Sequence, residues 1–581
     1  MKETFKNLKW FFKEKWKQYL VCLFLLIIVS ITPVVPAKLL GLMIDEISMS
    51  TLTTHNLILY IIGLIGFPVL TYIVNIFYHY YINKLGQDLS FALRERYIVH
   101  LFEMDQGFFE KYTKGDLISR ATNDLNSLTT FATGFLQNVV YYISLIIASI
   151  AMMIIINPLL TIASCLIMPF AVTFLNKKRK KKREYYKLHQ EIYANMTENV
   201  LESIEGVKTV RAYGEEENDF KKTKKAIDAD VNSWWKILKF ESLFTPMFEL
   251  VYAFCYFIAI GLGCYMVITS TISPGDLVSF LVYVAMFNTP LVGLSNLLNS
   301  VTNISIASAR YFEIMNTIPE VQNLDSPVSI MKFDTIEFQH VSFKYPFDDF
   351  EVIKDISFTI KSGETIGVVG PTGAGKSTLI KQLLREFNIT SGKILINDIP
   401  LEDYKIEDVR NLVGYVPQDH ILFRRSVDDN ILIGNPHAST KSIDDAIKIA
   451  DFKKDLEALP YGLDTMVAEL GGSLSGGQRQ RLSIARALVK DPEILILDDS
   501  LSAVDALTET NIIKHLKESR NNKTNIIVAH RFSAVAGADK IIVMQNGKIT
   551  DVGTHKELLK YDNWYKEQYL RQIKGDRYEK L

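Results

Sequence analysis

The stretch that decides the fold is Gly370-Pro371-Thr372-Gly373-Ala374-Gly375-Lys376-Ser377. It has the spacing G-x-x-x-x-G-K-S of a phosphate-binding loop. The apolar segment 365–369 before it predicts a strand, and the segment 377–387 after it predicts a helix. Glycines let the backbone N–H groups of such a loop point at an anion, and the helix N-terminus adds the positive end of its dipole. The stretch therefore predicts a site for ATP or GTP, rather than a plain glycine turn.

The last two residues of this loop and the residue after it are predicted to contact the nucleotide. Lys376 is placed to reach the β- and γ-phosphates, and the hydroxyl of Ser377 is placed to ligate Mg²⁺. Thr378, the next residue, completes the set that we expect to contact the nucleotide.

Four further positions in the same half of the chain fit nucleotide chemistry. The buried-type strand 494–498 ends in Asp498 and Asp499, a Walker B pattern. Asp498 is placed to hold Mg²⁺ through water, and Asp499 to orient or deprotonate the attacking water. His530, at the end of another apolar strand, could contact the γ-phosphate, and Gln418 could sense Mg²⁺ and the water. Taken alone, a histidine at a strand end is usually structural, and a glutamine carries almost no information.

A second anion-binding device lies about a hundred residues after the loop. It is the run Leu474-Ser475-Gly476-Gly477-Gln478, placed before a segment, 479–489, that predicts a helix. Backbone N–H groups at a helix N-terminus bind anions. One nucleotide needs only one such device, so the second predicts a dimer with ATP held between two copies of the domain.

The first half of the chain has the pattern of a membrane domain. The segment 1–18 contains six lysines with interleaved aromatic residues, which predicts a basic amphipathic helix at a membrane surface rather than an ordinary surface helix. A bilayer needs about 20 apolar residues per helix. Six spans are therefore predicted at 19–44, 57–82, 135–156, 159–176, 243–268 and 277–300, with a tight helical hairpin that turns at 157–158.

The basic residues set the predicted orientation. The N-terminal segment and the run 177–183 are rich in Lys and Arg, whereas 45–56 and 269–276 contain neither. By the positive-inside rule, both termini, the connections 83–134 and 177–242 and the nucleotide domain are cytoplasmic in a multi-pass protein of the cell membrane. The basic run follows a span directly, which favours a membrane-surface role over nucleic-acid binding.

The two long connections are polar and predict helices. The pattern predicts a helix break at 105–107 in the first connection and a helix over 198–212 in the second. We expect the membrane helices to continue into the connections as stalks, each pair joined by a short transverse segment. Two charges fall inside predicted spans, Lys38 and Glu249. A charge buried in a membrane is costly, so each of these residues is a candidate functional group. Lys38 could equally snorkel outward, and Glu249 is the better candidate for a residue that lines a cavity.

The four cysteines lie in apolar runs and are predicted to be small core residues, not disulfide partners or metal ligands.

The chain of 581 residues is too long for one domain. We expect an interfacial helix at 1–18, the six-span domain at 19–317, a linker at 318–330, the nucleotide domain at 331–570 and a charged tail at 571–581. After the linker, short strands alternate with helices, which predicts an α/β fold. The fold class is then membrane α-helical, followed by an α/β nucleotide-binding domain.

These motifs together resemble an ATP-binding-cassette exporter half-transporter over nearly the whole chain. The resemblance rests on the phosphate loop, Gln418, the signature 474–478, Walker B, the D-loop 502–505 and the H-loop at His530. It implies ATP and Mg²⁺ as cofactors. It also implies that the aromatic ring that stacks on the base falls on Tyr345, that Glu469 lies in a loop that senses the membrane helices, and that coupling helices fall near 106–109 and 210–213.

One residue departs from the family's pattern. The family usually has Glu after Walker B, and here Asp499 stands there. This resembles the subunit of heterodimeric exporters that carries the degenerate ATP site, whose partner has Glu and completes the competent site with this chain's signature. A homodimer with slow hydrolysis at both sites, and a regulatory membrane protein that senses ATP, remain alternatives. The expected cargo is a hydrophobic small molecule, drug or lipid, although the aromatic residues of the spans also suit plain packing against lipid.

Overall fold

The structure, a computed structural model, describes the backbone of residues 2–346 and 348–578. The side chains left out within these ranges lie mainly at 167–183, in parts of 241–248 and 291–302, and at 574–578.

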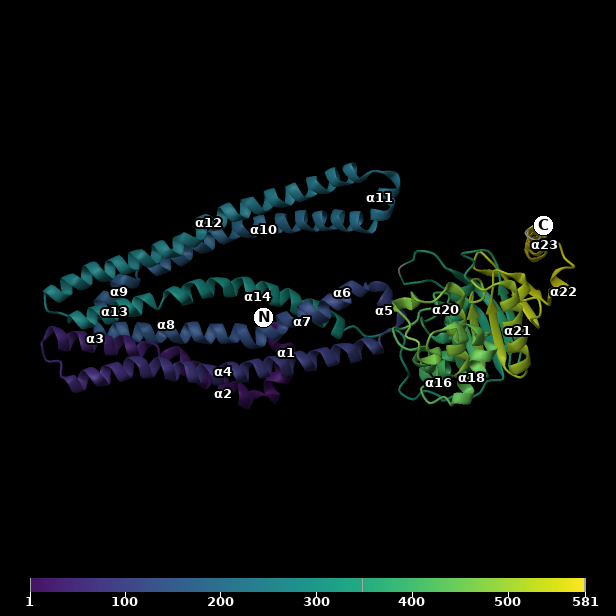
Figure 1. The fold of residues 1–581 in the computed structure, drawn as a ribbon, viewed down its shortest axis with the longest axis horizontal. Helices are drawn as coiled ribbons and strands as arrows, with labels where there is room; N and C mark the ends of the chain where they lie inside the picture. The colour runs from purple at the N-terminus through teal and green to yellow at the C-terminus, as the bar shows by residue number, and fades with distance from the viewer. Residues whose placement is uncertain (1, 347, 579–581) are drawn as a thin grey trace. The chain divides into compact units, whose positions relative to one another are not determined.

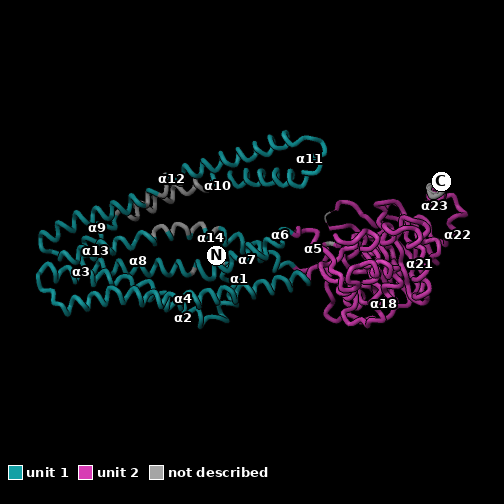
Figure 2. The backbone as a smooth tube through the Cα atoms, in the orientation of Figure 1, with its two compact units in different colours: residues 1–102, 115–317 teal, residues 103–114, 318–581 magenta. Residues whose placement is uncertain are grey.

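The chain forms two compact units, which Figure 2 draws in different colours. Unit 1 comprises residues 1–102 and 115–317, and unit 2 comprises 103–114 and 318–581. The short segment 103–114 therefore groups with the nucleotide-site half of the chain, although it interrupts the helices of the first half.

Unit 1 is helical throughout most of its described length (Figure 1). The longest elements, α4 and α12, run for 50 and 53 residues, so the predicted continuation of apolar spans into polar stalks is observed. The helices are α1 (Lys2–Glu14), α2 (Trp16–Ile31), α3 (Val34–Ser48), α4 (Thr54–Glu103), α6 (Lys114–Ser119), α7 (Leu125–Thr130), α8 (Leu136–Ile156), α9 (Pro158–Cys165), α10 (Ile167–Glu205), α11 (Val207–Tyr213), α12 (Glu216–Ile268), α13 (Pro274–Ala285) and α14 (Asn288–Met315).

Four stretches of the described residues are long and apolar enough to cross a membrane: Trp16–Ser48, Thr54–Glu103, Lys114–Ile156 and Glu249–Ile268. They correspond to four of the six predicted spans. The other two, at 159–176 and 277–300, include residues whose side chains lie outside the described set, so the count of six stays a prediction.

Local sequence signals explain where these helices break. Pro33 precedes α3 and divides the first predicted span into α2 and α3. Asn157 ends α8 and caps α9, its side chain accepting a hydrogen bond from the N–H of Leu160 at 3.0 Å. The predicted hairpin at 157–158 is thus present. The helix expected over 1–18 ends at Glu14, and its inner face packs inside unit 1, because Leu8 and Phe11 are buried.

Both predicted transverse segments are short helices. The first, α5 (Gln106–Lys111), begins after Asp105, so the break expected at 105–107 lies at 104–105 instead. The second, α11, is separated from α10 at Gly206 and ends at Gly214, which adopts the left-handed conformation that glycine permits. The single helix predicted over 198–212 is therefore wrong in its interior.

The contact of α3 with α13 settles the environment of Lys38. Its Nζ lies 2.8 Å from a carboxylate oxygen of Asp276, so it is paired within the protein rather than simply turned toward solvent. Along the same line of contact, which we call the α3–α13 seam, Asp45 accepts hydrogen bonds from Ser273 Oγ at 2.6 Å and from the N–H of Gly275 at 2.7 Å. The backbones approach so closely that a Cβ on Gly275 would lie 1.9 Å from the carbonyl oxygen of Gly41.

Glu249, the second charge expected in a span, opens the apolar stretch of α12 and is exposed in the single chain. Its role as a cavity-lining group stays a prediction. All four cysteines are free, as expected, but Cys264 is exposed and is not a core residue.

An ion-pair network joins α6 and the π-helical turn after it (Arg120–Asp124) to α14. Arg120 contacts carboxylate oxygens of Asp116 and Glu313, each at 2.8 Å, and Arg310 contacts Asp116 at 2.6 Å. The Arg120 side chain is nearly buried, and the carboxylates of these partners compensate its positive charge. The network fixes one stalk against the last helix of unit 1.

Unit 2 is built on two sheets with a hydrophobic core between strands and helices. The larger sheet has the strand order β10-β9-β3-β8-β7-β6, and the smaller has the order β2-β1-β4-β5. The strands are β1 (Thr335–Phe343), β2 (Ile353–Lys361), β3 (Thr365–Val369), β4 (Ser391–Ile396), β5 (Ile399–Pro400), β6 (Val413–Val416), β7 (Ile494–Asp498), β8 (Thr524–Val528), β9 (Lys540–Gln545) and β10 (Lys548–Gly553).

Helices cover these sheets, as an α/β fold requires. They are α15 (Lys376–Lys381), α16 (Ile406–Leu412), α17 (Val427–Leu432), α18 (Thr440–Ile449), α19 (Lys453–Ala458), α20 (Gly476–Leu488), α21 (Ala506–Ser519), α22 (His555–Leu558) and α23 (Trp564–Tyr578). The expected charged tail is mostly part of α23, and 579–581 lie outside the described residues. The expected linker, 318–330, is part of unit 2, where Val328 pairs with the backbone at 403–405.

The α3–α13 seam gives a stability prediction. Gly275→Ala would push a methyl group into the backbone of α3, and such overpacking costs on the order of 1–3 kcal/mol. We expect a thermal unfolding midpoint several degrees below that of the wild type in the same detergent. Gly66→Ala on α4 is the matched control, because nothing lies within 4 Å of its added Cβ. Equal midpoints for the two variants would contradict the close packing at Gly275.

Candidate functional site

Four adjacent parallel strands bring the predicted site residues to one edge of the larger sheet. β3 pairs with β8, β8 with β7, and β7 with β6, all in parallel. The phosphate loop follows β3, His530 follows β8, Asp498 ends β7 and Gln418 follows β6. Because parallel strands end at the same edge, residues far apart in sequence meet there.

Two glycines of the loop are required by its backbone. Gly370 has φ +156°, and a Cβ there would lie 2.1 Å from the carbonyl oxygen of Met544. Gly375, at the start of α15, has φ +92°, and a Cβ there would lie 2.9 Å from the carbonyl oxygen of Val352. A side chain at either position would clash with neighbouring backbone. The helix after the loop is shorter than predicted, because α15 ends at Lys381 and a 3₁₀ turn follows it.

Lys376 is buried inside its own loop. Its Nζ donates to the carbonyl oxygens of Gly370, at 2.8 Å, and Pro371, at 3.0 Å. Burial lowers the pKa of Lys376, whereas the nearby Asp499 and Asp498 act to raise it. A phosphate group bound in the loop would place negative charge beside Lys376 and so stabilise the charged form of its side chain.

Asp498 is a buried carboxylate with both oxygens hydrogen-bonded. It accepts from the hydroxyl of Ser377 at 2.7 Å and from that of Tyr415 at 3.2 Å. Oxygen donors of this kind suit Mg²⁺, which is commonly held by one or two protein groups plus substrate phosphates and water. No cluster of three or more His, Cys, Asp or Glu side chains suited to a metal occurs among the described residues. Ser377 and Asp498 therefore fit a Mg²⁺–nucleotide complex.

Asp499 lies half-buried directly after the strand. Its backbone is left-handed, with φ +48°, a conformation that Asp tolerates better than most residues, and its N–H donates to Val528 O at 3.0 Å. Burial raises the pKa of Asp499, and Asp498 raises it further, while His530 and Lys376 oppose this shift. The carboxylate is thus positioned beside the lysine and histidine that the sequence assigned to the same reaction.

One cavity of about 210 Å³ gathers most of the predicted residues. It is lined by Thr372, Gly373, Ala374, Gly375, Lys376, Ser377, Thr378, Gln418, Asp499 and His530, together with Val352 and Val528. Tyr415 and Val352 were missed by sequence reasoning. Tyr415 lies three residues before Gln418, and only the pairing of β6 with β7 shows that its hydroxyl reaches Asp498.

Tyr345 lies beside the phosphate loop. Its hydroxyl lies 3.1 Å from Thr378 Oγ1, and its ring packs edge-on against Phe343 and Phe387, with centroids 4.9 and 5.2 Å away. It therefore contacts the loop residue Thr378 but is not among the residues that line the cavity. Its stacking on a base stays a prediction.

The signature forms the N-terminus of α20, which begins at Gly476 rather than at the predicted 479. Ser475 and Gln478 make a reciprocal cap: Ser475 Oγ accepts from the N–H of Gln478 at 3.3 Å, and Gln478 Oε1 accepts from the N–H of Ser475 at 2.9 Å. None of the described residues of 474–478 lines the cavity at the phosphate loop. Within one chain the two anion-binding devices are separate.

Helix α5 is tied to the rest of unit 2 by its capping residue. Asp105 accepts a hydrogen bond from the N–H of Phe108 at 2.9 Å with one carboxylate oxygen. Its other oxygen accepts from the backbone N–H groups of Glu320 and Val321. Phe108 is buried, so α5 is anchored by both an apolar and a polar contact.

Comparison with known proteins agrees with this site and fold. Residues 19–291 match the family model described as the ABC transporter transmembrane region, and residues 353–502 match the model described as ABC transporter. The chain is 40% identical over 577 residues to the probable multidrug resistance ABC transporter ATP-binding/permease protein YheI of Bacillus subtilis, with 98% of each chain covered. It is 32% identical to the multidrug resistance-like ATP-binding protein MdlA of Escherichia coli, covering 98% of this chain and 96% of the relative.

A solved structure has the same fold. The structure of a bacterial Atm1-family ABC exporter with ATP bound superimposes with a TM-score of 0.82 at 25% identity, covering 96% of this chain and 99% of that one. The membrane helical unit, the α/β unit and the phosphate-loop edge therefore occur together in known exporters. The chain belongs to the ATP-binding-cassette transporter family, and its activity is that of an ATPase coupled to export across a membrane.

Proposed function

We propose that this chain is one half of a heterodimeric exporter of hydrophobic or amphipathic compounds, and that its own ATP site hydrolyses weakly. The observation that carries this proposal is Asp499. The other ATP-site residues expected from the sequence are present, and most of them line one cavity. The carboxylate after Walker B is one methylene shorter than the family's usual Glu.

The shorter side chain places its carboxylate on the order of an ångström away from a water positioned for Glu. A misplacement of that size can cost about 10²-fold in rate. Binding depends on the loop, Lys376 and the Ser377–Asp498 pair, which do not involve the length of residue 499. The site is therefore suited to hold Mg-ATP more than to turn it over.

A second subunit completes each site in this proposal. The signature at 475–478 presents backbone N–H groups at a helix N-terminus, away from its own phosphate loop. It would bind the γ-phosphate held by a partner whose Walker B ends in Glu. Helix α11 supports the same assembly, because all its residues are exposed or half-exposed in the single chain, including the apolar Val207 and Tyr213. We assign it to contact the partner's cassette.

The residues of this chain have defined tasks in the transport cycle. Lys376 and the loop N–H groups would hold the β- and γ-phosphates, Ser377 and Asp498 would hold Mg²⁺, and Gln418 and His530 would orient the water. Bound there, Mg²⁺ would supply charge that neutralises the phosphates. ATP binds the closed pair of cassettes better than the open pair, and this difference in affinity shifts the membrane domain between its two states. Hydrolysis at the competent site then releases the cassettes.

The cargo and orientation follow from coarser features. Relatives with multidrug-resistance names favour hydrophobic compounds over peptides or sugars. The basic segments 1–18 and 177–183 favour cytoplasmic termini and a cytoplasmic nucleotide unit. A homodimer with slow turnover at both sites, and an ATP-sensing regulator, are the rival proposals that Asp499 also permits.

The first test is substitution of Asp499 in a co-purified heterodimer. Asp499→Asn should lower ATPase activity only modestly, because the partner's Glu site carries most turnover. Asp499→Glu should raise the number of hydrolytic sites per dimer from one toward two, as counted by nucleotide trapping. Loss of all turnover in Asp499→Asn would instead assign hydrolysis to this site, as the homodimer predicts. ATP binding without dye transport in any pairing would favour the regulator.

The second test concerns the signature. Ser475→Ala and Gly477→Asp should each strongly reduce hydrolysis at the partner's site, because they remove a phosphate contact or bring a negative charge to it. Ser439→Ala is the control, since Ser439 also caps a helix of unit 2 through its hydroxyl, at 3.2 Å from the N–H of Ser442. It should lose a helix cap, on the order of 1 kcal/mol, without losing ATPase activity. Full activity of Gly477→Asp would refute the cross-dimer assignment.

A further inference from the structure

The contacts along the α3–α13 seam change in character from one end of α3 to the other. The two helices run antiparallel, because Val34 contacts Tyr283 whereas Asp45 contacts Ser273. At the start of α3, Val34 and Ala37 belong to an apolar cluster that includes buried residues of α8, α9, α12 and α13. Burial of apolar surface therefore holds this end of α3 in place.

The rest of the seam, toward the end of α3, is polar. Lys38 is paired with Asp276, and Asp45 accepts two hydrogen bonds from the start of α13. Between these contacts the backbones meet at Gly41 and Gly275, which carry no side chains. Parting this half would expose groups that water can hydrogen-bond, whereas parting the first half would expose buried apolar side chains.

The chain can bend where α3 begins. The helical run is broken at 32–33, between α2 and α3. Pro33 and Pro36 have no backbone N–H, so two of the hydrogen bonds that would make α2 and α3 one helix cannot form. The N–H of Val35 donates instead to Thr32 O, three residues back, at 3.2 Å. A break of this kind is a place where a helical segment can pivot.

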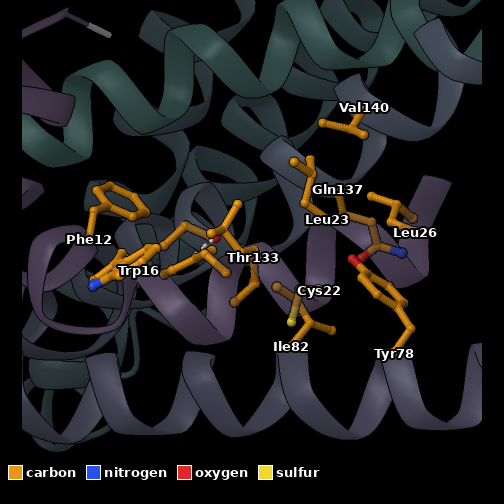
Figure 3. A pocket seen from close by; sticks show the side chains of 13 residues that line it. Phe12, Trp16, Cys22, Leu23, Leu26, Tyr78, Ile82, Thr133, Gln137 and Val140 are labelled. Atoms are coloured by element: carbon orange, nitrogen blue, oxygen red, sulfur yellow. Dashed lines mark hydrogen bonds between the residues drawn. The ribbon is translucent and has the colours of Figure 1, made fainter.

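The two sides of the break are held differently. Figure 3 shows α2 among its neighbours, where mostly apolar side chains of α1, α2, α4 and α8 surround a pocket of about 440 Å³. Cys22 and Leu26 of α2 are almost fully buried there, as are Tyr78 and Ile82 of α4. Helix α2 is therefore the fixed side of the break, and the polar half of α3 is the side that can move.

This polar half lies toward the predicted outer surface of the membrane. The loops at 49–53 and 269–273, after α3 and before α13, contain no Lys or Arg. Loops without basic residues are expected on the outer side. An exporter has to open its path on that side to release cargo and to close it afterwards.

The ion pair in the seam favours two distinct states. The side chains of Lys38 and Asp276 are 33% and 28% exposed, so each charge is partly removed from water. Separating them without admitting water would leave two unpaired charges in an apolar surrounding, which is strongly unfavourable. The seam is therefore stable when it is closed and paired, or when it is open and filled with water.

We propose that residues 38–48 of α3 form a hinged flap that pivots at 32–33 and parts from α13 to open the outer end of the export path. The Lys38–Asp276 ion pair holds the flap shut. Val34 and Ala37 lie close to the pivot, so they move least and keep their apolar contacts. The inference rests on the proposed function, because the flap uses the two states between which ATP shifts the membrane unit.

The test is crosslinking of cysteine pairs in the co-purified dimer, in a background without the native cysteines. Asp45→Cys with Ser273→Cys places a pair across the flap contact, where the parent side chains are 2.6 Å apart. A reducible bifunctional reagent with a short spacer joins the two thiols. ATP with vanadate, which traps nucleotide in the closed cassettes, should slow this crosslink by about tenfold or more, because only molecules with a closed flap react.

Glu46→Cys with Asn56→Cys is the matched control. These residues join α3 to α4 at 3.2 Å, next to the tested pair but away from α13. This pair should crosslink equally fast with and without nucleotide. Equal rates for the Asp45–Ser273 pair, in samples that have trapped nucleotide, would overturn the proposal.

The crosslinks also test transport. The completed Asp45–Ser273 crosslink should stop dye efflux until a reductant removes it, and the control crosslink should leave efflux unchanged. Efflux that continues through a crosslinked seam would refute the flap. Absence of dye efflux before crosslinking, together with a nucleotide-dependent crosslinking rate, would instead contradict the proposed cargo and support the flap.

Two further variants test the ion pair and the direction of opening. Lys38→Gln leaves Asp276 unpaired and should slow the nucleotide-free crosslink by about threefold or more, whereas Lys38→Arg should keep the parent rate. An unchanged rate in Lys38→Gln would show that the ion pair does not hold the flap. Ser273→Cys alone, which keeps Asp45, should react faster with an impermeant maleimide from outside when ATP and vanadate are present. Slower or equal labelling would contradict opening at the outer face.

Discussion

The parallel pairing of β3, β8, β7 and β6 is the constraint on which the nucleotide site depends. Each strand ends at the same edge, so each delivers one component there: the phosphate loop, His530, the two aspartates and Gln418. The hydrogen bond between Ser377 and Asp498 then joins components that lie 121 residues apart in sequence. The strands are buried and rich in Ile, Leu and Val, so the hydrophobic core that stabilises the sheet also fixes the spacing of the catalytic groups.

At Asp499 the backbone and the side chain determine different parts of the geometry at this edge of the sheet. Its amide is held by Val528 O, and its left-handed conformation turns the chain away from the strand. The position of its Cβ is thus set by the sheet, and the reach of the carboxylate depends on side-chain length alone. In the proposed function, the shorter Asp would therefore affect the attacking water while the residues proposed to bind the phosphates and Mg²⁺ keep their positions. This separation is the physical basis of our proposal that the site retains ATP with little turnover.

Sequence reasoning succeeded where a motif specifies local geometry. The strands before the phosphate loop and at Walker B and the turn at Asn157 each contain their own structural reason, and all three were found at the expected residues. The signature helix begins at Gly476, three residues earlier than predicted. Sequence reasoning failed where distant contacts decide. The pairing of Lys38 with Asp276 joins residues 238 apart, and the bond of Tyr415 to Asp498 depends on the register of two strands. Helix limits were also missed, because Asp105 and Gly206 act through capping and backbone conformation that periodicity does not reveal.

The two short helices between the long ones differ in a way that matters for coupling. Asp105 and Phe108 fasten α5 to the unit that holds the phosphate loop, through backbone amides at 320–321 and an apolar contact. Helix α11 presents its apolar side chains to solvent in the single chain. Exposed apolar groups at the tip of a long helical pair are unfavourable unless a partner covers them. In the proposed function, the partner subunit supplies this covering surface for α11, whereas α5 is held within its own chain.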